Sequence, residues 1–114
     1  MSCAGRSLQG VETTVCDRIE ALINALSHFG YSAWITSGYR DSTRQAALYQ
    51  RWISGRSKYP AQPPGKSLHE RGLAVDIGST AEGLEVAGFL APYVGLTWGG
   101  HFTHVDPVHF ELRL

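Results

Sequence analysis

The run SLHERGLAVDIGS, residues 67–79, carries an aspartate in the middle of a strand-like apolar segment, Leu73–Ile77. Strands disfavour aspartate, and burying a lone carboxylate costs several kcal/mol unless a cation or strong hydrogen-bond donors compensate its charge. Any fold open to this chain must therefore bring such a partner to Asp76 from another part of the sequence.

The first third of the chain predicts two helices with a strand between them. Apolar residues recur at three- and four-residue steps over residues 11–29, which is the pattern of one buried helix face. Residues 31–37 are rich in strand formers and predict a strand. A capping box of Ser42 and Gln45 then predicts a second helix over residues 42–53.

A loop and a short helix are predicted around the aspartate-bearing strand. Residues 55–66 contain three prolines and two glycines, which is typical of a loop. A capping box of Ser79 and Glu82 predicts a third helix, and Pro92 must end it because proline lacks the N–H that a helix interior needs.

Two more strands are predicted, around residues 94–98 and 108–114. In the last one the side chains alternate, so His109 and Glu111 share one face while apolar residues occupy the other. The whole pattern predicts a single α+β domain over residues 1–114, with a small, mostly antiparallel sheet flanked by about three helices and residues 1–8 as a flexible tail.

Composition excludes several classes of protein. Ten basic and ten acidic residues give zero net charge, so no overall field favours nucleic acid or a charged membrane as partner. No apolar run approaches the roughly 20 residues of a membrane span, and the N-terminal residues lack the apolar core of a signal peptide. We therefore expect a chain that is synthesised in the cytoplasm, and we also predict that it is a monomer.

The two cysteines, Cys3 and Cys16, are too few for a disulfide scaffold or a cysteine-rich zinc site. Cys16 lies in the apolar-periodic stretch, and we expect it in the core. A cysteine amidase that uses Cys16 and a histidine is an alternative enzyme class, and a core position for this thiol counts against it.

Three side chains stand out as metal ligands: His69, Asp76 and His109. A turn at Gly72 can bring His69 and Asp76 to one point, and His109 would come from the last strand. Imidazole and carboxylate are ordinary zinc ligands, and three protein ligands leave a fourth position for water, which indicates catalysis. Alternatively, Asp76 caps a turn or pairs with an arginine such as Arg71.

Two further residues have the chemistry of a peptidase. Asp106 lies three residues before His109 and just ahead of Pro107, which should begin the strand, so this carboxylate is our candidate for moving a proton. Arg40, after the first strand, could hold a substrate carbonyl and stabilise the oxyanion that develops.

These residues form an ordered set of motifs. They are SGYR at residues 37–40, S-x-H-x-x-G-x-A-x-D at 67–76, WGG at 98–100 and D-x-x-H-F-E at 106–111. The set resembles the zinc peptidases of peptidoglycan, which include D-alanyl-D-alanine carboxypeptidases and phage L-alanyl-D-glutamate endopeptidases. Their fold resembles the Hedgehog signalling domain, and the resemblance covers roughly residues 31–114.

The resemblance implies one Zn²⁺ per chain, held by His69, Asp76 and His109. It implies Asp106 as the catalytic carboxylate and Arg40 as the arginine that binds the carbonyl. Many carboxypeptidases of this family carry glutamate where this chain has Asp106, so aspartate here looks more like the phage endopeptidases.

The resemblance also implies an activity and a place of action. It favours an L-alanyl-D-glutamate endopeptidase that cuts the peptidoglycan stem peptide as a phage endolysin, released to the cell wall by a separate holin. A D-alanyl-D-alanine carboxypeptidase or dipeptidase is the nearest alternative. A non-catalytic, zinc-stabilised cell-wall-binding module is the alternative from another class.

Four more residues are candidates for substrate contact: Ser67, Trp98, His101 and His104. For Trp98 the alternative is a core or sheet-packing position. For the two loop histidines the alternative is a plain polar loop, and either one as a fourth zinc ligand would close the site. A serine nucleophile at Ser67 is a further alternative, but the metal explains the neighbouring histidines and aspartate better.

Overall fold

The computed structural model describes residues 8–113, which form an α+β fold as the sequence predicts. Four strands make one antiparallel sheet in the order β1-β2-β4-β3. The strands are β1 Trp34–Ser37, β2 Ala74–Gly78, β3 Thr97–Trp98 and β4 His109–Glu111. The helices are α1 Thr13–His28, α2 Ser42–Ile53 and α3 Ala81–Leu90, with short 3-10 helices η3 Leu68–Arg71, η4 Ala91–Val94 and η5 Gly99–His101.

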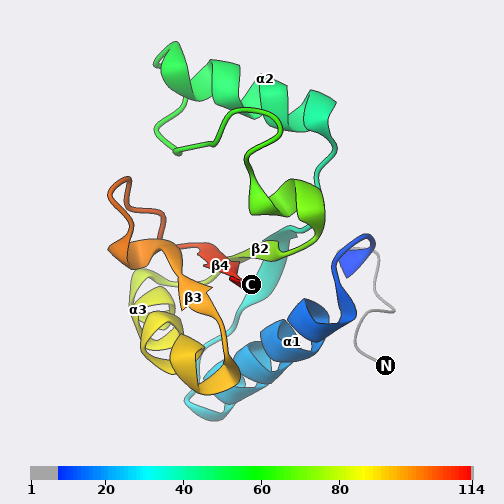
Figure 1. The fold of residues 1–114 in the computed structure, drawn as a ribbon. Coiled ribbons are helices and arrows are strands. Elements are labelled where there is room, and N and C mark those ends of the chain that lie inside the picture. The colour runs from blue at the N-terminus through cyan, green and yellow to red at the C-terminus, as the bar shows by residue number, and fades with distance from the viewer. Residues whose placement is uncertain (1–7, 114) are drawn as a thin grey trace.

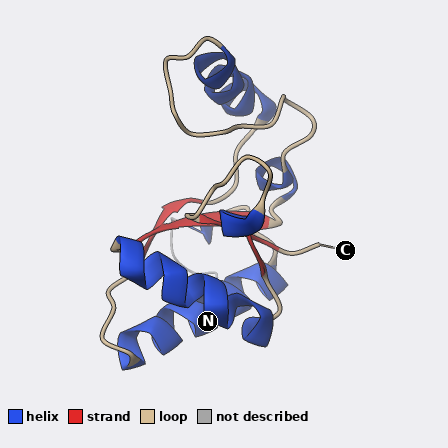
Figure 2. Cartoon of the chain, turned by 90° about the vertical axis from the view of Figure 1, so that its left-hand side faces the viewer, coloured by secondary structure: helices blue, strands red, loops and turns tan. Residues whose placement is uncertain are grey.

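The helices are divided between the two sides of the sheet. Helices α1 and α3 lie together on one side, and α2 lies on the other with the loop that follows it (Figures 1 and 2). We call α2 and residues 54–66 the arm. This division leaves the sheet face opposite the core helices turned toward the arm.

The core lies between the sheet and α1. The buried face of α1 carries the residues of the predicted periodicity, Val15, Cys16, Ile19, Leu22 and Leu26. Leu8, expected in a flexible tail, is instead 5% exposed and packs in this core, while residues 1–7 of that predicted tail lie outside the described residues. Burying such apolar surface contributes about 25 cal/mol per Å².

The strand register gathers polar side chains on one face of the sheet. Asp76 of β2 pairs with Ser37 of β1 on one side and with His109 of β4 on the other. Paired residues project to the same face of an antiparallel sheet. The last strand is shorter than predicted, but its alternation is confirmed, because Phe110 packs in the core while His109 and Glu111 line the opposite face with the arm.

The predicted capping box of Ser42 and Gln45 is wrong by one residue. The side chain of Asp41 accepts the hydrogen bond from the Arg44 backbone N–H at 2.8 Å, so Asp41 is the N-cap. A carboxylate at this position accepts that bond more strongly than a hydroxyl one residue later can. Gln45 is thereby free to turn inward, where it is fully buried.

The box of Ser79 and Glu82 is wrong for a similar reason. Thr80 caps α3 by accepting from the Gly83 N–H at 2.9 Å, while the Ser79 hydroxyl donates to the Ser32 carbonyl. The strand expected over residues 94–98 is shorter, because residues up to Val94 form η4. None of the helices between residues 8 and 113 has the length and apolar character that crossing a bilayer requires.

Candidate metal centre

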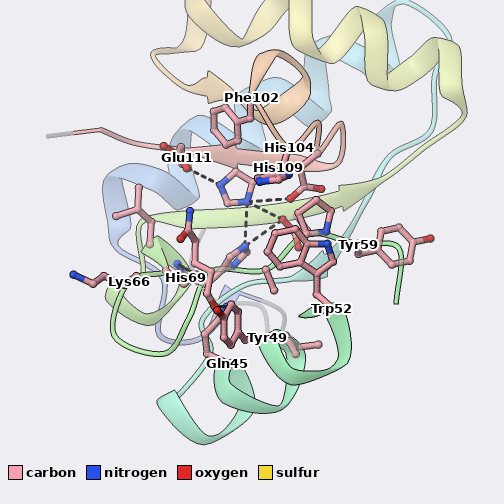
Figure 3. Close-up of a pocket in the computed structure, with 18 of the residues that line it drawn as sticks. Gln45, Tyr49, Trp52, Tyr59, Lys66, His69, Phe102, His104, His109 and Glu111 are labelled. Atoms are coloured by element: carbon pink, nitrogen blue, oxygen red, sulfur yellow. Dashed lines mark hydrogen bonds and ion pairs between the residues drawn. The ribbon is translucent and has the colours of Figure 1, made fainter. Parts of the chain in front are cut away.

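A cleft of about 940 Å³ separates the sheet from the arm. Its floor is formed by β2, β4 and η3, and the arm forms the facing wall. Figure 3 shows Glu111 and Lys66 on one side of the histidine pair, with Trp52 and Tyr59 on the other. The cleft therefore has a charged end and an aromatic end.

A short 3-10 helix positions the first histidine of the site. Ser67 caps η3 by accepting from the His69 backbone N–H at 3.2 Å. Gly72 ends η3 with φ 71°, and a Cβ there would lie 2.5 Å from the Gly10 carbonyl oxygen, so the turn requires glycine. The chain can then reverse into β2 with His69 buried over the sheet.

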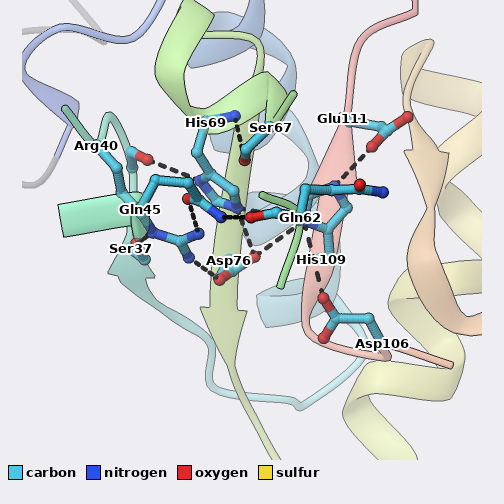
Figure 4. A network of polar contacts seen from close by, with 11 residues as sticks. Ser37, Arg40, Gln45, Gln62, Ser67, His69, Asp76, Asp106, His109 and Glu111 are labelled. Atoms are coloured by element: carbon cyan, nitrogen blue, oxygen red, sulfur yellow. Dashed lines mark hydrogen bonds and ion pairs between the residues drawn. The ribbon is translucent and has the colours of Figure 1, made fainter. Parts of the chain in front are cut away.

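His69, Asp76 and His109 converge on one point, as Figure 4 shows. Asp76 Oδ1 lies 3.2 Å from His69 Nε2 and 3.2 Å from His109 Nδ1. The two histidine nitrogens are 3.3 Å apart. The structure thus brings together the three side chains that the sequence predicts as ligands.

Each histidine uses its other nitrogen for a hydrogen bond that fixes the position of its proton. His69 Nδ1 lies 2.8 Å from the carbonyl oxygen of Gly38, which can only accept, so this nitrogen donates. His109 Nε2 lies 2.7 Å from Glu111 Oε1 and donates to that carboxylate. In neutral rings, the lone pairs of His69 Nε2 and His109 Nδ1 therefore face Asp76.

This donor set fits zinc. Ligand atoms held about 2.0–2.1 Å from a tetrahedral zinc ion lie about 3.3 Å from one another. The three separations in the structure, 3.2, 3.2 and 3.3 Å, match that spacing. Within residues 8–113 no fourth His, Cys, Asp or Glu joins the group, so this part of the chain supplies three ligands.

A proton on His109 joins that ring to both neighbouring carboxylates when no ion is bound. Burial lowers the pKa of His109, but its hydrogen bonds to Asp76 and Glu111 outweigh that effect and raise it to about 9. Burial raises the pKa of Asp76, yet hydrogen bonds from His109 and His69 hold it well below its usual range. The site therefore favours a cation, and a metal must displace a proton to bind.

Asp106 lies beside the three donor atoms without joining them. Its Oδ2 is 4.0 Å from His109 Nδ1, and its backbone is fixed by bonds to Gly99 and His109. Burial raises the pKa of this carboxyl, and the negative charge of Asp76 raises it further. A carboxylate with a raised pKa is suited to taking up and releasing a proton.

Arg40 lies on the opposite side of Asp76, as Figure 4 shows. Its Nη2 donates to Asp76 Oδ2 at 2.9 Å, so this arginine, and not Arg71, is the charge partner of the aspartate. Its Nε donates to Ser37 Oγ and its Nη1 to Gln45 Oε1, each at 3.1 Å. Three of the five N–H groups are thus engaged, and the guanidinium orientation is fixed.

The four residues predicted for substrate contact differ in their positions. Ser67, His101 and His104 line the cleft. Trp98 does not: the residue is 8% exposed and its Nε1 donates to the Pro107 carbonyl at 2.7 Å. Of the two positions that the sequence left open for Trp98, it occupies the one in the core, where β3 pairs it with Phe110.

The two loop histidines stay outside the metal group. The His104 ring lies edge-on to Trp52 of the arm at a centroid distance of 5.0 Å. The His101 ring makes the same kind of contact with Trp98, also at 5.0 Å. Neither histidine closes the site as a fourth ligand in the described chain.

Sequence reasoning missed the functional positions of Gln45 and Glu111. Gln45 joins the arm to the floor, because its Oε1 accepts from Arg40 and its Nε2 donates to the Gln62 carbonyl at 2.8 Å. No local signal in the sequence could reveal this role. For Glu111 the signal was present, since strand alternation places it on the same face as His109.

Cys16 offers no chemistry to the cleft. It is fully buried on α1 in the core, on the other side of the sheet from the arm, which rules out the cysteine amidase alternative for this residue. Cys3 lies outside the described residues.

Comparisons with known proteins agree with a metal-dependent peptidase site. Residues 9–93 match the family VanY, D-alanyl-D-alanine carboxypeptidase. A D-alanyl-D-alanine carboxypeptidase of Enterococcus faecium is 40% identical over 68 residues, which are 60% of this chain and 20% of that protein. The chain spans less than a third of the length of the curated relatives it matches, 29% and 20%.

Solved structures share the fold. A vancomycin resistance D,D-pentapeptidase VanY, in complex with Zn(II), aligns with a TM-score of 0.75 and 18% identity over 90% of this chain and 72% of that one. The L-Ala D-Glu endopeptidase ChiX of Serratia marcescens aligns with a TM-score of 0.65 and 20% identity over 94% of this chain and 84% of that one.

Proposed function

The chain belongs to the VanY D-alanyl-D-alanine carboxypeptidase family, and on that premise we propose that it is a zinc-dependent peptidase of the peptidoglycan stem peptide. The observation that carries this proposal is the convergence of His69, Asp76 and His109 at the spacing of tetrahedral zinc ligands. A carboxylate and a guanidinium lie on either side of that point, Asp106 and Arg40.

The residues around the metal divide the work of hydrolysis. Zinc bound by the three ligands would lower the pKa of water toward about 7 and polarise a carbonyl. Asp106 takes a proton from the attacking water and delivers it to the leaving nitrogen. The remaining N–H groups of Arg40 donate to the carbonyl oxygen as negative charge develops there. Hydrogen bonds to Ser37 and Gln45 hold the Arg40 guanidinium in place.

For the scissile bond, we propose the one between L-alanine and D-glutamate. Asp106 is aspartate, as in the phage endopeptidases that the motifs resemble, and the fold is shared with an L-Ala D-Glu endopeptidase. The cleft also extends to both sides of the histidine pair (Figure 3), so a peptide could continue past the cleaved bond in both directions. A role as a phage endolysin acting on the cell wall after holin release stays a prediction.

A D-alanyl-D-alanine carboxypeptidase is the second candidate, and the family match favours it. This reaction needs a cation to hold the terminal carboxylate of the peptide. Lys66 and Arg51 line the cleft and could supply that cation.

Digestion of purified cell-wall sacculi tests the proposal. The chain is incubated with sacculi as isolated, with a chelator, and with chelator followed by added zinc, and mass spectrometry identifies the fragments. We expect zinc-dependent release of peptides with a new free N-terminus on glutamate. Release of terminal D-alanine would support the carboxypeptidase instead. Hydrolysis that is indifferent to the chelator would contradict both.

A further inference from the structure

We propose that Glu111 is a positioning residue of the metal centre, which holds the protonated Nε2 of His109 and so aims Nδ1 of that ring at the ion. This inference rests on the proposed zinc site. It adds to the site a carboxylate that is outside the ligand group and acts through the ring of His109.

The geometry of β4 sets this role. His109 and Glu111 are two residues apart on one strand, so their side chains project to the same face. Glu111 Oε1 lies 2.7 Å from His109 Nε2, and Glu111 is only 6% exposed. Its other oxygen, Oε2, accepts from Nε of Arg113. With both oxygens engaged inside the chain, Glu111 is held in place to orient the ring.

The two histidine ligands differ in how their outer nitrogens are held. His69 donates to the backbone carbonyl of Gly38, which no substitution can remove. His109 donates to a side chain, so its partner can be deleted. A carboxylate behind a metal-binding histidine fixes the tautomer and ring orientation and makes the ring a stronger ligand.

Arg113 and Phe102 complete the surroundings of this pair. The Arg113 guanidinium lies over the Phe102 ring at 5.2 Å, and that ring lies 5.7 Å from the ring of His109. Both carboxylate oxygens of Glu111 face N–H donors, Oε1 that of His109 Nε2 and Oε2 that of Arg113 Nε. This contact selects the tautomer of His109 that carries its proton on Nε2, with the lone pair on Nδ1.

Zinc affinity is the first measurement. Competition with a chromophoric chelator is carried out on the wild-type chain, Glu111→Ala and Glu111→Gln, with Glu85→Ala and Glu85→Gln as controls. Glu85 is exposed on α3, so its variants make the same charge change away from the cleft. We expect Glu111→Ala to bind zinc about 10- to 100-fold more weakly. Glu111→Gln should lose less, because its amide oxygen can still accept from Nε2.

Nitrogen NMR of the cadmium-113-loaded protein is the second measurement, because a general loss of stability would not change it. We expect coupling between cadmium and Nδ1 of His109, and a slowly exchanging proton on Nε2, in the wild-type chain. In Glu111→Gln the proton on Nε2 should exchange faster while the metal stays on Nδ1.

The outcomes separate this inference from the proposed function. If the wild-type chain binds no zinc, both are overturned. If it binds zinc but the Glu111 variants bind within about twofold of it, or the metal lies on Nε2 of His109, only the positioning role is overturned. If Glu111→Ala does not fold by circular dichroism, the affinity and spectrum of Glu111→Gln decide alone.

Discussion

The floor and the arm of the cleft hold their side chains in different ways. On the floor, Asp76 and His109 are paired across β2 and β4, and each is bonded to further side chains around it. On the arm, Gln45 is the one buried residue of α2, and aromatic side chains such as Trp52 and Tyr59 face the cleft. Tyr59 is 62% exposed.

This difference separates the chemistry from the choice of substrate. A side chain with several bonded partners loses little freedom when it acts, so the floor is prepared for metal binding and proton transfer. Exposed arm side chains such as Tyr59 can adapt to a bound peptide. We therefore expect floor variants to change metal binding and kcat, and arm variants to change KM.

The largest effect should follow from Asp76→Asn on the floor. The change removes a ligand and leaves Arg40 buried without its charge partner, with the two side chains at 11% and 13% exposure. We expect zinc content and wall hydrolysis to fall to background, and the free energy of unfolding to fall by about 3–5 kcal/mol. Elemental analysis, cell-wall turbidity and urea unfolding measure the three. A variant that still bound one zinc per chain would contradict the ligand assignment.

Asp106→Asn should have the next largest effect. It should separate catalysis from metal binding. Asp106 is outside the ligand set, so the variant should keep one zinc per chain. Its kcat should fall about 10²- to 10⁴-fold, because the amide cannot take up the proton. The rate of stem-peptide cleavage and the zinc content are measured on the same sample.

If Asp106→Asn cleaves as fast as the wild-type chain, Asp106 is not the group that moves the proton. If the zinc-loaded wild-type chain binds cell walls but hydrolyses no bond, the non-catalytic binding module becomes the better account.

Arg40→Lys tests the hydrogen bonds that connect the floor with the arm through Arg40. Lysine keeps the charge but cannot reach Asp76, Ser37 and Gln45 together, because it lacks the planar fork of arginine. We expect kcat to fall by about 10²- to 10³-fold with zinc retained. Arg44→Lys, an exposed change on α2, is the control and should behave as the wild type does. Equal kcat values for the two variants would remove Arg40 from the reaction.

Trp52→Ala on the arm should have the smallest effect. The ring packs edge-on against His104 across the cleft, and such an aromatic contact contributes about 0.5–1.5 kcal/mol. We expect KM for a stem-peptide fragment to rise about 3- to 10-fold, with kcat and zinc affinity unchanged. A loss of zinc affinity in this variant would show that floor and arm are not separate.

Much of the floor could be predicted from the sequence because its signals are local or periodic. Asp76 in an apolar strand requires a charge or hydrogen-bond partner, and strand alternation placed His109 on the same face as Glu111. Antiparallel pairing of β2 with β4 then brings the two ligands together, because it sets Asp76 directly opposite His109.

The arm and the helix caps could not be predicted in the same way. Gln45 resembles a capping residue in sequence, but its buried position depends on Arg40 and on the Gln62 carbonyl, 17 residues further along the chain. At the starts of α2 and α3, neighbouring side chains can accept from the same backbone N–H groups. Tertiary contacts decide which of them becomes the N-cap. For Trp98 the sequence left a core position and a cleft position open, because a loop-side tryptophan and a core tryptophan look alike in sequence.

X-ray absorption of the chain loaded with one equivalent of zinc tests most directly whether His69, Asp76 and His109 form an open metal centre. The predicted spectrum has two imidazole nitrogens and one carboxylate oxygen at about 2.0–2.1 Å, together with an exchangeable water oxygen. A spectrum with sulfur, with a third imidazole from His101 or His104, or with no exchangeable ligand would contradict the account.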